Sequence, residues 1–218
     1  MPLTDQTAAE CRDLAARYPD GRSALLPMLH LVQSEEGMIT PAAIEMCSDV
    51  LDLTTAEVTA VATFYTMYRQ KSPGGTHHIG VCVNTLCGLL GGDAVYDALA
   101  RRLGVSSGET TEDGGFTLER IECQAACTHA PVMTVDWEFF DRTTIADAMR
   151  VIDALEAGEM VIATRGPAVR GWRATERTVA GIDDGLADEA SCIDELMLAG
   201  LEVAKEKGMS APATGKGA

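Results

Sequence analysis

The chain has 218 residues, seven of them cysteine, and a formal net charge of −16. That length suits one large domain or two modest ones, and the acidic balance argues against a nucleic-acid surface, which needs a basic patch. The first residues carry neither a basic nor an apolar leader and no run approaches the roughly 20 apolar residues of a membrane span, so we expect a cytoplasmic protein with reduced cysteines and no direct membrane insertion.

Residues 1–72 have the pattern of a small helical bundle. We expect four helices there. The first two span Ala8–Arg17 and Arg22–Ser34, the third begins at Thr40–Pro41, and the fourth begins at Thr54. A threonine N-cap followed by proline is a good helix start, which fixes the third. Thr54 with Glu57 three residues later forms a capping box, which opens the fourth.

Residues 73–160 predict a thioredoxin-like α/β domain, separated from the bundle by the turn-rich run Ser72–Gly75. Strands are expected at His77–Val83, Phe116–Glu122, Pro131–Trp137 and Glu138–Arg142, and helices at Asp93–Leu103 and Thr144–Glu156. Strand–helix–strand followed by a hairpin and a helix is the element order of that fold. Asp93 is the expected N-cap of the first of these helices, which would aim its amide end at the loops before it.

Residues 161–218 form a C-terminal extension of different character. Arginines are interleaved with Trp172, and an acidic run and an amphipathic helix around Leu196 follow. A solvated tail is one interpretation. Arginine with tryptophan is also typical of interface hot spots, so we expect Arg165–Gly208 to dock on another subunit and the end, Met209–Ala218, to be disordered.

Two cysteine pairs follow the first two strands of the predicted domain. Cys82 and Cys87 come after one strand, and Cys123 and Cys127 after the next. Loops that leave neighbouring strands can enclose one small metal centre from two sides. Four thiolates are the usual ligand set of a [2Fe–2S] cluster, a [4Fe–4S] cluster or a structural zinc ion, and the ligand count alone does not choose among these.

The spacing and the small neighbours of these cysteines favour an iron–sulfur cluster over zinc. The C-x4-C spacing is at the edge of the zinc range, and glycines 88, 91 and 92 with Ala125 and Ala126 let the backbone approach a wider cluster closely. A dithiol/disulfide pair ranks third, because neither pair has C-x-x-C spacing. Four buried core cysteines are the remaining alternative.

Other candidate ligands and motifs are weaker. Cys11, Cys47 and Cys192 lie on helical patterns far in sequence from either pair, so we expect none of them to bind the metal. His129 suggests Rieske-type ligation, but four cysteines already complete a ligand set. The glycines after Cys87 fail the G-x-G-x-x-G pattern, so the chain shows no dinucleotide fingerprint of its own.

Three further runs carry a family resemblance. They are Glu36–Gly37–Met38–Ile39, Val61–Ala62–Thr63–Phe64–Tyr65 and Ala130–Pro131–Val132. Together with the four-cysteine spacing they resemble the small [2Fe–2S] subunit of NADH:quinone oxidoreductase, the 24-kDa-type E subunit of complex I. The resemblance covers roughly residues 20–160 and leaves the C-terminal extension outside it.

The resemblance implies a thioredoxin-like [2Fe–2S] ferredoxin domain with Cys82, Cys87, Cys123 and Cys127 as the ligands of one cluster. It implies an electron-transfer subunit of an oxidoreductase and translocase, with no catalytic residue of its own. FMN and NADH would bind a neighbouring subunit, whose flavin exchanges electrons with this cluster. Other peripheral-arm subunits would be partners, at the inner face of the cell membrane. Leu86 replaces a proline common in relatives, which should not affect ligation.

Two alternatives stay open at this stage. The same architecture resembles diaphorase-type subunits of NAD-linked formate dehydrogenases and hydrogenases. In a different class, the chain would be a zinc-stabilised interaction module without redox activity.

Overall fold

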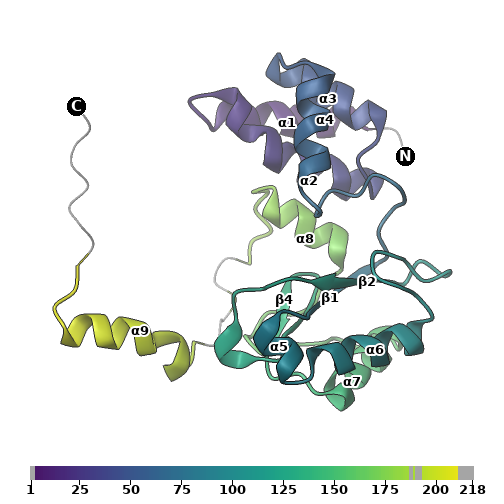
Figure 1. Ribbon diagram of the computed structural model, residues 1–218. Helices are drawn as coiled ribbons and strands as arrows, with labels where there is room; N and C mark the ends of the chain where they lie inside the picture. The colour runs from purple at the N-terminus through teal and green to yellow at the C-terminus, as the bar shows by residue number, and fades with distance from the viewer. Residues whose placement is uncertain (1–2, 187–188, 190–192, 211–218) are drawn as a thin grey trace.

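The computed structural model describes residues 3–186, 189 and 193–210, which form a helical bundle, an α/β domain and C-terminal helices (Figure 1). Cys192 and residues 211–218 lie outside the described residues, and so do the predictions made for them. No helix within the described ranges is long and apolar enough to cross a membrane.

The N-terminal bundle begins each of three helices at a threonine cap. Its helices are α1 (Asp5–Ala16), α2 (Leu25–Glu36), α3 (Pro41–Leu51) and α4 (Thr55–Phe64). The Thr40 hydroxyl accepts a hydrogen bond from the Ala43 N–H at 3.1 Å, and Thr54 and Glu57 form the complete capping box. These two predicted helix starts are confirmed.

The second helix of the bundle starts later than predicted. A short 3-10 helix, η1 (Gly21–Ala24), precedes α2, because the Asp20 carboxylate accepts from the Arg22 N–H and closes a tight turn. The α-helix therefore begins at Leu25, and Pro27 falls in its first turns, where its missing N–H is tolerated.

The α/β domain is built on a four-stranded sheet in the order β2-β1-β3-β4. Its strands are β1 (His77–Cys82), β2 (Phe116–Ile121), β3 (Met133–Val135) and β4 (Glu138–Phe140). The pair β1 and β2 is parallel, and the other neighbours are antiparallel. A parallel pair needs a crossover, which α6 (Gly92–Leu103) supplies.

The helices α6 and α7 (Ile145–Glu156) cover one face of the sheet (Figure 1). Alternate side chains of β1, Ile79 and Val81, point into this apolar core against Leu99 of α6 and Ile152 of α7. The predicted helix Thr144–Glu156 is present as α7, with Thr144 as its N-cap. The side chains of the intervening β1 residues lie on the opposite face, and Cys82 is one of them.

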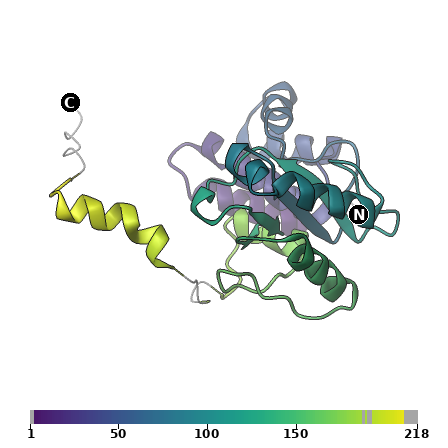
Figure 2. The ribbon, with the colours of Figure 1, turned by 60° about the horizontal axis from the view of Figure 1, so that its bottom comes forward.

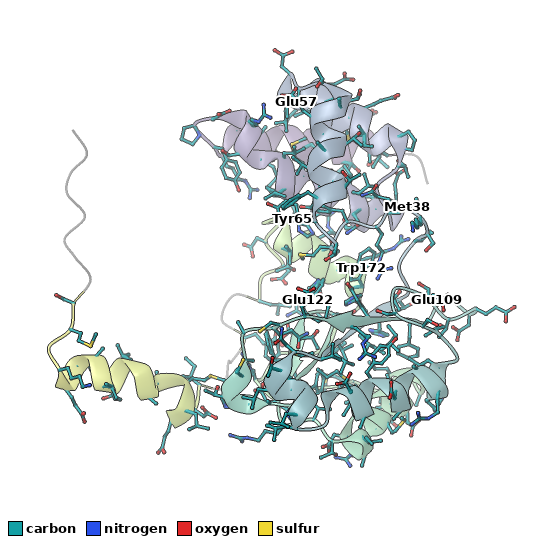
Figure 3. All side chains as sticks on the ribbon, in the orientation of Figure 1. Met38, Glu57, Tyr65, Glu109, Glu122 and Trp172 are labelled. Atoms are coloured by element: carbon teal, nitrogen blue, oxygen red, sulfur yellow. The ribbon has the colours of Figure 1, made fainter. Side chains whose placement is uncertain are left out.

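The segment after α7 returns to pack between the bundle and the sheet. It carries α8 (Trp172–Val179), which the sequence prediction missed. Figure 3 shows Trp172 between the two parts, and its side chain is 1% exposed. The Trp172 N–H donates to the Thr76 carbonyl at 2.9 Å, and Ala180 joins the apolar core of the bundle.

A buried polar network ties α8 to α2. The Glu176 carboxylate contacts His30 Nδ1 at 2.6 Å and accepts from the Gln33 side chain at 3.0 Å. Nearby, Arg177 pairs with Glu10 and Glu35 of the bundle. Buried charged groups are tolerated only when they are paired in this way.

The docking of Arg165–Gly208 on another subunit stays a prediction, but the first part of this segment packs within the chain. That prediction rested on arginine and tryptophan content, but Trp172 is buried within the chain, and Arg165 pairs with Asp141. A chain truncated after Ala163 would lose the segment that packs between the bundle and the sheet. The last helix of the described ranges, α9 (Glu195–Glu206), has no buried residue, so the docking prediction now rests on it alone.

Candidate metal centre

The sheet brings the two cysteine loops to the same edge. In the parallel pair of β1 and β2, Cys82 lies opposite Ile121, and these are the last residues of their strands. Cys123 follows two residues later. Since both strands run in the same direction, both loops leave the sheet side by side, as the sequence predicted.

The first loop folds into one helical turn that carries Cys87 inward. Asn84 caps α5 (Thr85–Leu89), accepting from the Thr85 N–H at 2.7 Å. The turn leaves Cys82 2% and Cys87 3% exposed, while Leu89 on its other side is 81% exposed. This short helix was not predicted, although an asparagine followed by threonine is a recognisable cap signal.

The second loop is held by an unusual backbone conformation. Ala125 has φ of 54°, in the left-handed region that non-glycine residues rarely adopt. Its N–H points back and donates to Cys123 Sγ at 3.3 Å, which is the kind of contact that stabilises a cluster-bound thiolate. A 3-10 turn, η2 (Cys127–His129), follows. Cys123 and Cys127 are both exposed.

A glycine lets α6 begin directly against the first cysteine loop. A Cβ on Gly92 would lie 2.4 Å from the Cys82 carbonyl oxygen and 2.9 Å from that of Cys87, so no other residue fits there without a shift. The helix is capped by Gly91, and the prediction of Asp93 as N-cap is wrong. Asp93 instead pairs with Arg120 across the surface. The amide end of α6 still abuts the loop, where it favours negative charge.

The thiol pKa values show that the cysteines of the two loops act on one another. Burial, with contributions from the neighbouring Cys82 and Cys127, raises the pKa of the Cys87 thiol to about 11. The neighbouring Cys123, followed by burial and Cys82, raises the pKa of Cys127. Since charges shift pKa values mainly at short range, these influences link the thiols of the first loop to those of the second. Without a metal, Cys87 and Cys127 therefore hold their protons at neutral pH, and binding a metal would release them.

The surroundings of the thiols fit a binuclear cluster. Ala126 and Val132 are buried against Cys82 and Cys87, with Ala130 and Phe139 packed around them, so the inner side is apolar. A [2Fe–2S] cluster spreads its four thiolates over two iron atoms, so two pairs of thiols suit it.

The other candidate ligands are used elsewhere. His129 is buried, with Nδ1 against the Thr128 hydroxyl at 2.8 Å and Nε2 against the Asp194 carboxylate at 2.6 Å. Both ring nitrogens are therefore engaged, and neither is free for a metal. His77 and His78 begin β1 as expected, paired with Asp136 and Glu119.

The two remaining described cysteines lie in the bundle, away from this site. Cys11 and Cys47 are fully buried in its apolar core. Burial raises the pKa of Cys11 to about 11 and that of Cys47 further still. Such thiols stay protonated and unreactive, which suits core residues rather than ligands.

The sequence did not predict the structural roles of two residues near the centre. Ala125 adopts its left-handed conformation without the glycine or asparagine that would signal it. Asp194 lies 65 residues beyond His129 in the chain, and only the fold brings their side chains together.

Comparison with known proteins identifies the family. The model of the family described as thioredoxin-like [2Fe-2S] ferredoxin matches residues 11–156. A Mycobacterium tuberculosis protein named as the E subunit of NADH-quinone oxidoreductase is 50% identical over 206 residues, 94% of this chain and 81% of that protein. A Rhizobium meliloti protein named as the E 2 subunit of NADH-quinone oxidoreductase is 38% identical over 152 residues, 70% of this chain and 90% of that protein.

A solved structure shares the fold. It is an NAD+-reducing [NiFe]-hydrogenase in the air-oxidized state, with a TM-score of 0.55 and 21% identity over 62% of this chain and 23% of the hydrogenase chain. At that identity the likeness concerns the fold alone. The family model and the relatives go further: the chain belongs to the thioredoxin-like [2Fe–2S] ferredoxin family, among the E subunits of NADH-quinone oxidoreductase.

Proposed function

We propose that this chain is the electron-transfer subunit of the NADH-oxidising module of respiratory NADH:quinone oxidoreductase. It would hold one [2Fe–2S] cluster through Cys82, Cys87, Cys123 and Cys127. The observation that supports the proposal is that the two cysteine loops leave the same edge of the sheet, where the parallel strands β1 and β2 end. Membership among the E subunits supports the assignment of the parent complex.

The chain's own residues prepare that place for a cluster. Gly92 removes the side chain that would block the first loop, and the Ala125 N–H is aimed at the Cys123 sulfur. Val132 and Ala126 exclude water from the inner side. Limited water and N–H donors to sulfur both tune the potential of such centres.

The two sides of the centre differ in access. Cys82 and Cys87 are buried, whereas Cys123 and Cys127 are exposed. A redox partner would therefore approach from the side of the second loop, where the shortest path through protein to the sulfur atoms lies.

The partner we propose is a subunit that carries FMN and binds NADH. NADH gives up a hydride, two electrons together, whereas a [2Fe–2S] cluster held by these thiolates supplies one-electron transfer. A flavin can accept the hydride and release its electrons singly. This chain lacks the glycine fingerprint of a dinucleotide site, so that chemistry belongs to the partner. Association with the complex would place the chain at the cytoplasmic face of the membrane.

The experiment that tests this division follows the cluster by EPR during stepwise addition. NADH is first mixed with the purified chain, and the flavin-bearing subunit of the same complex is added second. We expect no reduced-cluster signal before the second addition and a full signal after it. A signal from NADH and the chain alone would overturn the proposal. Dithionite serves as the control that shows the cluster to be reducible.

A further inference from the structure

The helix α9 has an apolar side that is exposed or only half-buried in the described chain. At 100° per residue, one continuous side of this helix is made of apolar or small residues: Leu196, Met197, Gly200, Leu201, Val203 and Ala204. The other side carries Glu202 and Lys205, which form an ion pair in solvent. A soluble helix with such a stripe normally packs it against another surface.

The stripe stands apart from the body of the molecule. Figures 1 and 2 show α9 beyond the sheet domain in two orientations, with no helix or strand of the described ranges beside it. None of its residues is buried, in contrast to α8, which packs against α2 through Trp172 and Glu176. The chain therefore uses its other C-terminal helix internally, whereas no stripe residue of this one is buried by the described chain.

The base of α9 is fixed to the second cysteine loop. Asp194 is its N-cap, accepting from the Met197 N–H at 3.0 Å through Oδ1. The other carboxylate oxygen lies 2.6 Å from Nε2 of the buried His129. His129 ends the short turn that begins at Cys127. One carboxylate thus caps the helix and ties it to the loop that carries a cluster ligand.

The nearby surface of the centre is also apolar. On the outer side of α5, next to Cys87, the exposed side chains are Leu86, Leu89 and Leu90. Isolated exposed leucines are common, but several around a redox centre mark an interaction surface. The stripe of α9, with its base at Cys127, would extend that surface outward from the centre.

We propose that α9 is a docking arm whose apolar stripe binds the same redox partner that exchanges electrons with the cluster. This inference rests on the proposed function. The contact between α9 and the second loop favours the redox partner as the protein that binds the stripe. A protein that covers α9 near its base also lies beside the exposed Cys123 and Cys127. A second copy of this chain seated there would block the access that electron transfer requires.

In this arrangement Asp194 is a positioning residue. It acts through His129 and the helix cap, holding the start of the arm where the partner meets the cysteine loop. The arm adds contact area to the partner interface without adding any group to the cluster.

The test compares matched variants on the two sides of α9. Leu196→Ser with Leu201→Ser removes two apolar side chains from the stripe, and Glu202→Ser with Lys205→Ser changes two exposed residues on the other side. Each cluster-loaded full chain is titrated with the purified flavin-bearing subunit by biolayer interferometry. We expect the stripe variant to bind the flavin-bearing subunit with about tenfold lower affinity, because removing leucines buried at the centre of an interface causes a loss of this size. The control variant should bind with unchanged affinity.

A third variant examines the tether. Asp194→Ser keeps a good helix cap but removes the carboxylate that reaches His129. We expect weaker partner binding with the same dithionite-reduced EPR spectrum. If Asp194→Ser bound the flavin-bearing subunit with wild-type affinity, the role given to the contact between Asp194 and His129 would be wrong.

The remaining outcomes separate this inference from the proposed function. If the stripe variant and the wild type bound the flavin-bearing subunit equally well, α9 would not be a docking arm, and the electron-transfer role would be unaffected. A wild-type dimer in light scattering that the stripe variant abolishes would assign the stripe to a second copy and overturn the proposal. A wild-type chain that does not bind the flavin subunit at all would refute the proposed function itself.

Discussion

Replacing Trp172 with alanine tests whether the segment after residue 160 is part of the folded core. The side chain is 1% exposed and lies between the linker at Gly74 and the guanidinium of Arg69, which sits 5.5 Å from its ring. Truncating a buried tryptophan costs about 3–5 kcal/mol, and losing the cation–π contact adds about 0.5–1 kcal/mol. We therefore expect W172A to lower the free energy of unfolding by about 3.5–6 kcal/mol, a large share of the about 5–15 kcal/mol typical of a protein.

Urea denaturation followed by far-UV circular dichroism measures this change. The control is V179A, at an exposed position of the same helix, which should change the free energy of unfolding by no more than about 0.5 kcal/mol. W172F keeps an aromatic ring in the site and should fall between the two. If W172A unfolded within about 1 kcal/mol of the wild type, the segment would be a dispensable tail and the role given to α8 would be wrong.

Three further outcomes follow from the pKa values and the cysteine positions. Replacing Cys11, Cys47 and Cys192 with alanine should leave iron content and EPR line shape unchanged, with a loss of stability of about 1–2 kcal/mol from the two core sites; lost iron would contradict their assignment. Because the Cys87 thiol has a pKa of about 11, cluster assembly releases protons, so reconstitution yield should fall as pH is lowered from 8 to 6, and a yield independent of pH would count against thiolate ligation. The capping hydrogen bonds from Thr54 and then the contact with Arg22 lower the pKa of Glu57 to about 2, below the value of about 4.3 in the unfolded chain. The stability that ionised Glu57 contributes is therefore present above about pH 4.3 and is lost as the pH falls towards about 2. In acid titrations, the difference in stability between the wild type and E57A should close over that range.

The sequence predicted much of the fold because its signals are local. Threonine caps marked the helices that begin after Thr40 and Thr54, and the structure has both. The runs before the two cysteine pairs were predicted as strands and are β1 and β2, whose parallel pairing follows from the crossover helix between them. The cysteine pairs came to one edge for the same reason: each directly follows one of these strands.

What the sequence did not predict depends on contacts between distant residues. The arginines and Trp172 of the extension look like an interface when read alone, and only the position of Glu35 and Asp141 shows that they are satisfied within the chain. Asp93 looked like a cap, but the close approach at Gly92 moves the start of the helix. The left-handed Ala125 carries no local signal, because alanine adopts that conformation only when the surrounding loop imposes it.

The most direct test of the central claim is the iron content and EPR spectrum of the dithionite-reduced chain, alone and with each of Cys82, Cys87, Cys123 and Cys127 changed singly to serine. We expect about two iron atoms and one reduced [2Fe–2S] signal per wild-type chain. Each serine variant should lose the cluster or show an altered signal, because one of the four thiolates is then missing. About four iron atoms per chain, bound zinc with no visible absorption, or an unchanged signal in any of the four variants would contradict the assignment.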